Sequence, residues 1–151
     1  MKAIITSLLL LFSSLAFGQA PALAQQDDKA LQDYFTANNI RPKQLSSGVY
    51  MVIQNPGSGP HIHKRQGVTM YYTGKLLNGT TFDSNIGRSA LKVHAGLGEV
   101  IKGMDIALLE MKYGTKATIY IPSGMAYGGK EQAGIPANSI LIFELEIIGV
   151  L

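Results

Sequence analysis

The chain has 151 residues, of which 46% are hydrophobic and 15% charged, with 17 glycines and no cysteine. This length favours a single domain, and the composition is typical of a folded protein with many turns. A net charge of +3 at pH 7 is too small to indicate a nucleic-acid partner. The lack of cysteine excludes disulfides, thiol catalysis, thiolate metal sites and a diacyl-lipid anchor.

The start of the chain has the features of a secretory signal peptide. A positive start is followed by an apolar segment over residues 3–17 and by the small-x-small cleavage pattern Ala22-Leu-Ala24. An uncleaved membrane helix is the alternative, but it needs roughly 20 apolar residues, more than this segment supplies. We predict a signal peptide over 1–24, with cleavage after Gly18 as a second possibility. The protein is then exported, to the periplasm or the medium, with no membrane segment after cleavage.

The next segment, residues 25–45, is predicted to be a helical arm that precedes the main domain at 46–151. Within it, apolar residues recur at helical spacing over residues 27–39 and follow two aspartates that suit a helix start. The apolar residues are Ala30, Leu31, Tyr34 and Phe35. Self-association through this arm is one possibility, but its helix is short and we expect a monomer.

The main domain is predicted to combine several strands with one central helix. Alternating apolar residues and turn signals predict extended segments over 48–54, 67–77, 91–93, 115–121 and 139–150. The pair Asn78-Gly79 predicts a tight hairpin, and a 3.6-residue apolar period over 100–111 predicts a helix. A Gly- and Pro-rich loop over 122–138 is long enough to suggest a functional role. The expected class is α+β, with the helix covering one face of an antiparallel sheet.

The three histidines do not suggest a metal site. His61 and His63 lie in the basic run 61–65, and no pair of carboxylates is near them or His94 in the sequence. This run is interpreted as a solvated loop, with an anionic partner as the alternative. We expect no metal and no cofactor.

Six short motifs, in order across about residues 46–150, carry a resemblance to a known family. They are Tyr72-Thr-Gly74, Phe82-Asp-Ser84, Glu99-Val-Ile-Lys-Gly103, Ala126-Tyr-Gly128, Gly134-Ile-Pro136 and Leu141-Ile-Phe143. In these motifs the chain resembles the FKBP-type peptidyl-prolyl cis-trans isomerases, the macrolide-binding immunophilins. The resemblance implies a half-open antiparallel β-sheet wrapped around one short α-helix. It also implies isomerisation of Xaa-Pro bonds in proline-containing polypeptides, and so a role in protein folding outside the cytoplasm.

The resemblance also implies a pocket and a role for each residue in it. Its walls would be Tyr72, Phe82, Val100, Ile101 and Phe143, with Ile135 at the rim and Met104 at the floor. The Tyr127 hydroxyl and the backbone N–H of Ile101 would bind substrate carbonyls, and Asp83 would lie at the edge within reach of Tyr72. Taken singly, most of these residues would be interpreted as core residues or strand ends.

A pocket of this kind suits proline isomerisation because the twisted amide has lost its resonance and is less polar than the planar one. An apolar pocket therefore stabilises the twisted amide, relative to the planar one, more than water does. The alternative is a binding or chaperone module that has the same pocket but little turnover. Macrolide inhibitors are implied as further ligands, although Met104 stands where many family members have tryptophan.

Overall fold

The computed structural model describes residues 15–151, so most of the predicted apolar signal segment lies outside the described residues. The helices are α1 (Leu15–Ala37) and α2 (Lys102–Leu108), with short 3₁₀ turns η1 (Ser46–Gly48) and η2 (Ser123–Met125). The strands are β1 (Lys43–Gln44), β2 (Tyr50–Asn55), β3 (Gly67–Leu76), β4 (Thr81–Ser84), β5 (Leu91–His94), β6 (Lys116–Ile121) and β7 (Leu141–Val150).

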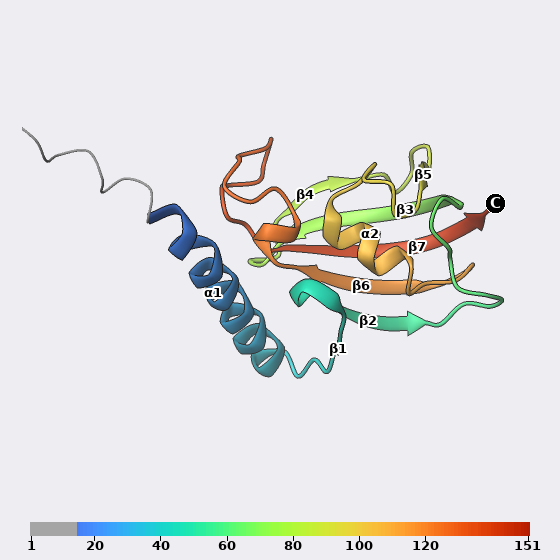
Figure 1. The fold of residues 1–151 in the computed structure, drawn as a ribbon. Helices are drawn as coiled ribbons and strands as arrows, with labels where there is room; N and C mark the ends of the chain where they lie inside the picture. Colours follow the sequence, from blue (N-terminus) through green and yellow to red (C-terminus); the bar gives the residue numbers. More distant parts are fainter. Residues whose placement is uncertain (1–14) are drawn as a thin grey trace, which may run out of the picture.

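Within this range the strands form one antiparallel sheet in the order β1-β2-β6-β7-β3-β4, and β5 pairs with β3 beyond this path. The short helix α2 lies across one face of the sheet (Figure 1). This architecture confirms the predicted α+β fold of an antiparallel sheet around a short helix. Helix α2 is shorter than the predicted 100–111 at both ends. Ile101 is still non-helical, at φ −57° and ψ 149°, and the helix ends at Leu108.

The main core lies between α2 and the inner face of the sheet. Strand β7 supplies every second side chain to this core, namely Leu141, Phe143, Leu145 and Ile147. Helix α2 contributes Met104, Ala107 and Leu108 from its buried side. The close approach of α2 to β6 depends on Gly103, because a Cβ added there would lie 2.4 Å from Cγ2 of Ile121. The inner face therefore fixes α2, and with it the residues just before α2, against the sheet.

A second core lies on the opposite face of the sheet and is covered by α1. Leu31 and Phe35 are buried there against a group of sheet residues, namely Tyr50, Tyr120, Ile140 and Ile142. The ring of Phe35 has its centroid 5.2 Å from that of Tyr50 and 4.9 Å from that of Tyr120. Alternation along β7 places Ile142 on this face and its neighbour Phe143 on the other. The predicted amphipathic helix is therefore packed onto the sheet.

The first helix is longer than the helix predicted over residues 27–39. It begins at Leu15 and continues through the predicted cleavage point at Ala24, with Pro21 inside it. Alanine and glutamine are good helix formers, so the segment that the cleavage pattern occupies also favours a helix. No helix within residues 15–151 is long and apolar enough to span a membrane.

Candidate functional site

A cavity of about 170 Å³ opens beside the start of α2. Its lining residues are Tyr72, Phe82, Asp83, Leu91, Glu99, Val100, Ile101, Met104, Tyr127 and Phe143. Side chains from β3, β4 and β7 meet there with the segment before α2 and with the long loop between β6 and β7. The structure thus brings together the predicted pocket residues, with one exception described below.

The aromatic walls depend on a glycine in the middle of β3. Gly74 pairs with Asp83 of β4 on one side and with Phe143 of β7 on the other. A Cβ on Gly74 would lie 2.6 Å from Cζ of Phe82 and 2.9 Å from Cε1 of Phe143. The two rings meet edge to face above this position, with centroids 5.6 Å apart. The absence of a side chain at Gly74 therefore creates the space in which both rings lie.

Asp83 and Tyr72 form a fixed polar pair at the edge of the cavity. The Tyr72 hydroxyl donates to Oδ2 of Asp83 at 2.6 Å, and the backbone N–H of Ser84 donates to Oδ1 at 2.8 Å. Burial of Tyr72, together with this hydrogen bond, raises the pKa of its hydroxyl to about 12. Tyr72 is therefore a neutral hydrogen-bond donor at physiological pH. The predicted hydrogen bond between Tyr72 and Asp83 is confirmed.

Two hydrogen-bond donors at the cavity are free to bind a ligand. Tyr127, which is 38% exposed, makes no side-chain hydrogen bond within the described residues. The backbone N–H of Ile101 also finds no acceptor in this part of the chain, because it precedes the first hydrogen-bonded turn of α2. An apolar cavity with two free donors can hold a group that has an apolar body and carbonyl oxygens.

Ile135 is the predicted pocket residue that does not line the cavity. It is buried in the main core, to which Phe82 also packs. A tight pair of backbone hydrogen bonds between Gln132 and Ile135, at 2.9 and 3.0 Å, closes this part of the loop on itself. In this structure Ile135 therefore supports the core near the wall.

Sequence reasoning missed Asn85, which fixes the position of Tyr72. Asn85 is a buried polar residue at the end of β4. Its Oδ1 accepts the backbone N–H of Tyr72 at 2.7 Å, and its own N–H donates to the Tyr72 carbonyl at 3.1 Å. Its position directly after the motif Phe82-Asp-Ser84 was only weak evidence for a role at the site, since asparagine is also common in ordinary turns.

Two acidic residues that organise the segment before α2 were also missed. Asp105 accepts the backbone N–H groups of Gly96 and Gly98 at 2.8 and 2.7 Å, which fixes the loop leading to Ile101. Glu99 lines the cavity and accepts the backbone N–H of His94 at 2.8 Å. This backbone hydrogen bond, followed by that of the His94 ring, lowers the pKa of Glu99.

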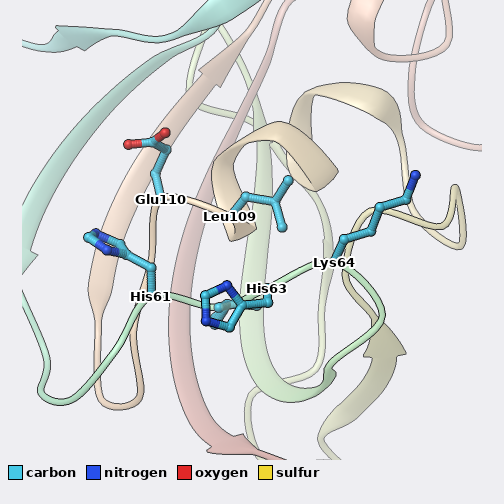
Figure 2. Close-up of a pocket in the computed structure, with 6 residues that line it drawn as sticks. His61, His63, Lys64, Leu109 and Glu110 are labelled. Atoms are coloured by element: carbon cyan, nitrogen blue, oxygen red, sulfur yellow. The ribbon is translucent and has the colours of Figure 1, made fainter.

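A larger hollow of about 390 Å³ lies between residues 61–64 and the end of α2 (Figure 2). Figure 2 shows the side chains of His61, His63 and Glu110 spread around it, not converging on one point. Glu110 is engaged by Lys43, whose Nζ lies 3.0 Å from its Oε2. Within the described residues, no group of three histidine or acidic side chains could hold a metal ion. The smaller cavity, with its free donors and aromatic walls, is therefore the better candidate site.

Comparisons with known proteins show which family the chain belongs to. The family model for "FKBP-type peptidyl-prolyl cis-trans isomerase" matches residues 59–148. FK506-binding protein 1 of Gibberella zeae is 43% identical over 106 residues, which cover 66% of this chain and 96% of that protein. A crystal structure of a peptidyl-prolyl cis-trans isomerase from Pseudomonas syringae pv. tomato has a TM-score of 0.69 at 30% identity, covering 84% of this chain and 95% of that one. The chain therefore belongs to the FKBP-type peptidyl-prolyl cis-trans isomerase family.

Some relatives are much longer proteins. FK506-binding protein 4 of Saccharomyces cerevisiae is 40% identical over 110 residues, which cover 73% of this chain but only 28% of that protein. The chain thus spans about a quarter to a third of the length of several of the curated relatives that it matches.

Proposed function

We propose that this protein catalyses cis-trans rotation about Xaa-Pro bonds in polypeptides. The observation that carries the proposal is the cavity between Phe82, Phe143 and Met104, which has free donors at Tyr127 and Ile101. Membership of the FKBP-type family supports it. By this activity the protein assists the folding of proline-containing chains.

The proposed mechanism requires no bond cleavage and no proton transfer. Rotation of an Xaa-Pro bond has a barrier of roughly 20 kcal/mol and takes tens of seconds without a catalyst. The proline ring lies against the aromatic walls, which favour the less polar twisted amide over the planar one. An acceleration of about 10⁵-fold corresponds to roughly 7 kcal/mol of preferential binding of the twisted state.

The polar groups hold the substrate while its amide turns. The Tyr127 hydroxyl and the Ile101 N–H each bind a carbonyl oxygen of the peptide, and neither has an acceptor of its own within the described residues. Asp83 lies next to the rotating amide and is held by Tyr72 and Ser84. These contacts fix the two sides of the bond, so that rotation is confined to the amide between them.

Tyr127→Phe and Asp83→Ala test this assignment. Tyr127→Phe should lower kcat/KM on a short Xaa-Pro peptide by about tenfold, because the hydrogen bond from its hydroxyl to a substrate carbonyl contributes up to about 1.5 kcal/mol. Asp83→Ala should lower it by a similar factor, because it removes the carboxylate that lies next to the rotating amide and holds Tyr72. NMR exchange spectroscopy on the peptide measures the rate directly. Tyr113→Phe is the matched control, because Tyr113 is also exposed, at 54%, but lies outside the cavity.

The same assay separates the enzyme from a binding or chaperone module that uses the same cavity. If folded wild-type protein binds the peptide without accelerating exchange, the binding module is correct and the enzyme assignment is wrong. If Tyr113→Phe loses as much activity as Tyr127→Phe, the assigned role of the cavity tyrosine is wrong.

We also propose that macrolide inhibitors bind this cavity. Two of the relatives described above are named FK506-binding proteins, and the walls available to such a ligand are those that would hold proline. The floor is Met104, whose flexible side chain can adjust to different ligands. Inhibition of the exchange assay by FK506 tests this proposal.

We further propose that the protein is exported to the periplasm or the medium after cleavage of residues 1–24. The support is the sequence pattern alone, a positive start, an apolar segment and Ala22-Leu-Ala24. Expression of the full chain in a bacterium should give a mature protein that begins at Gln25, measured by intact mass of the extracytoplasmic fraction. Leu9→Arg, which interrupts the apolar segment, should leave the protein uncleaved in the cytoplasm. A wild-type protein that retains Met1 would contradict the proposal.

A further inference from the structure

The N-terminal helix is connected to the loop that carries Tyr127 through a buried carboxylate. Asp27 of α1 is only 7% exposed. Its Oδ2 accepts two hydrogen bonds from Ser123, from the backbone N–H at 2.7 Å and from the hydroxyl at 2.5 Å. Figure 1 shows α1 beside the short turn η2, which opens the loop between β6 and β7. An acidic side chain 96 residues away in the sequence thus fixes the first residue of η2.

Ser123 in turn holds the backbone on both sides of Tyr127. Its carbonyl accepts the N–H of Ala126 at 3.0 Å and the N–H of Gly128 at 2.8 Å. These two residues are the immediate neighbours of Tyr127 in the chain. The carbonyl of Gly128 then accepts the N–H of Asn138 at 2.7 Å, at the far end of the loop. The backbone that carries Tyr127 is therefore attached to Ser123 on one side and to the return of the loop on the other.

We propose that Asp27 is a positioning residue for Tyr127, so that the N-terminal helix sets the geometry of the active-site loop. Ser123 transmits the constraint because the same residue donates to Asp27 and accepts from Gly128. Hydrogen bonds to a buried carboxylate are stronger than those between neutral groups, so the turn is held firmly. This inference rests on the proposed function, in which Tyr127 binds the substrate.

The neighbouring residue Asp28 has a different task and provides a control. It accepts the Tyr50 hydroxyl at 2.7 Å, and Gln32 donates to the same hydroxyl at 2.9 Å. Burial and the Asp28 hydrogen bond raise the pKa of Tyr50 to about 12, so this tyrosine is a neutral donor. Asp28 thus attaches α1 to β2 and makes no hydrogen bond to the loop within the described residues. Asp27 and Asp28 are the same residue type on the same helix, with different targets.

The first test is a set of variants measured by proline exchange. Asp27→Ala should lower kcat/KM by about fivefold, the rate equivalent of one net hydrogen bond. Asp27→Asn keeps an acceptor oxygen for Ser123, so its kcat/KM should stay close to that of the wild type. Asp28→Ala should have the wild-type kcat/KM. In a Tyr127→Phe background, Asp27→Ala should have no further effect, because the hydroxyl that it positions is already gone.

Three results in this set would overturn the proposal. The first is full activity of folded Asp27→Ala protein. The second is an equal loss in Asp28→Ala, which would mean that docking of α1 alone matters. The third is a loss in Asp27→Ala that adds in full to the loss in Tyr127→Phe.

A second test does not depend on activity. The backbone amide of Gly128, protected by the Ser123 carbonyl, should exchange with deuterium about tenfold faster in Asp27→Ala and at the wild-type rate in Asp28→Ala. If the exchange rate of the Gly128 amide is the same in Asp27→Ala as in the wild type, Asp27 does not position the loop, whatever the catalytic rates are. If the wild-type protein shows no catalysis but the exchange rate of the Gly128 amide rises in Asp27→Ala, the proposed function is wrong. The attachment of the loop to α1 through Asp27 and Ser123 is then still supported.

Discussion

Replacing Gly74 with alanine should reduce kcat/KM on an Xaa-Pro peptide by about tenfold or more, because it displaces the walls of the cavity. The new Cβ would lie 2.6 Å from the ring of Phe82 and 2.9 Å from the ring of Phe143. Phe82 is on β4 at the end of the sheet order and is only partly buried, so its ring is the one expected to move. Overpacking of this kind typically costs about 1–3 kcal/mol, so the protein should remain folded.

Gly67→Ala is the control for this substitution. Gly67 lies on the same strand, and a Cβ there would make an ordinary contact of 3.6 Å with Leu151. It should leave both stability and kcat/KM near their wild-type values. If Gly74→Ala has the wild-type rate, the aromatic walls do not have the role proposed for them.

The second large effect concerns stability. Phe35→Ala should lower the free energy of unfolding by about 3–5 kcal/mol, the usual cost of removing a buried phenylalanine. Phe35 is 4% exposed and packs edge to face against Tyr50 and Tyr120. Urea denaturation, followed by circular dichroism on the purified protein, measures the change.

Thr36→Ala is the neighbouring control. Thr36 is exposed on the same helix, and its hydroxyl donates to the carbonyl of Gln32 one turn earlier. Its replacement should change the free energy of unfolding by less than about 0.5 kcal/mol, as for most surface sites. A loss of similar size in both variants, or no loss in Phe35→Ala, would contradict the packing of α1 onto the sheet.

The hairpin beside the cavity could be predicted from a local sequence pattern, whereas the cavity itself was implied by the family resemblance. Asn78-Gly79 predicts the hairpin between β3 and β4, and in the structure Gly79 has the positive φ of 89° that such a turn requires. This hairpin brings Phe82 and Asp83 alongside β3, where Asp83 reaches Tyr72. The roles of these residues came from the family resemblance, since each residue alone is compatible with ordinary packing.

The second core could not be predicted in the same way. Tyr120 and Ile142 lie on the outer face of the sheet, where alternation gives no indication of a covering element. The residue that covers them, Phe35, comes from a helix far away in the sequence, and its amphipathic pattern does not identify its partner surface. Only the three-dimensional packing shows that α1 and the sheet share a core.

The polar contacts that position the site are also invisible in the sequence pattern. Asp27 and Asp105 bind backbone groups in the connections between strands, and Asn85 binds the backbone N–H of Tyr72 on β3. These contacts depend on how the chain folds around each side chain rather than on residue spacing. Ile135 was placed at the pocket rim because it lies in a motif of the family. The motif did not reveal the backbone turn between Gln132 and Ile135 that buries its side chain in the core. Such details follow from tertiary structure.

The most direct test of the central claim is the exchange rate of a short Xaa-Pro peptide, measured by NMR with and without catalytic amounts of the wild-type protein. The proposed function predicts a rate that rises in proportion to protein concentration and falls when Gly74→Ala protein is used in its place. A folded wild-type protein that leaves the exchange rate at its uncatalysed value would contradict it.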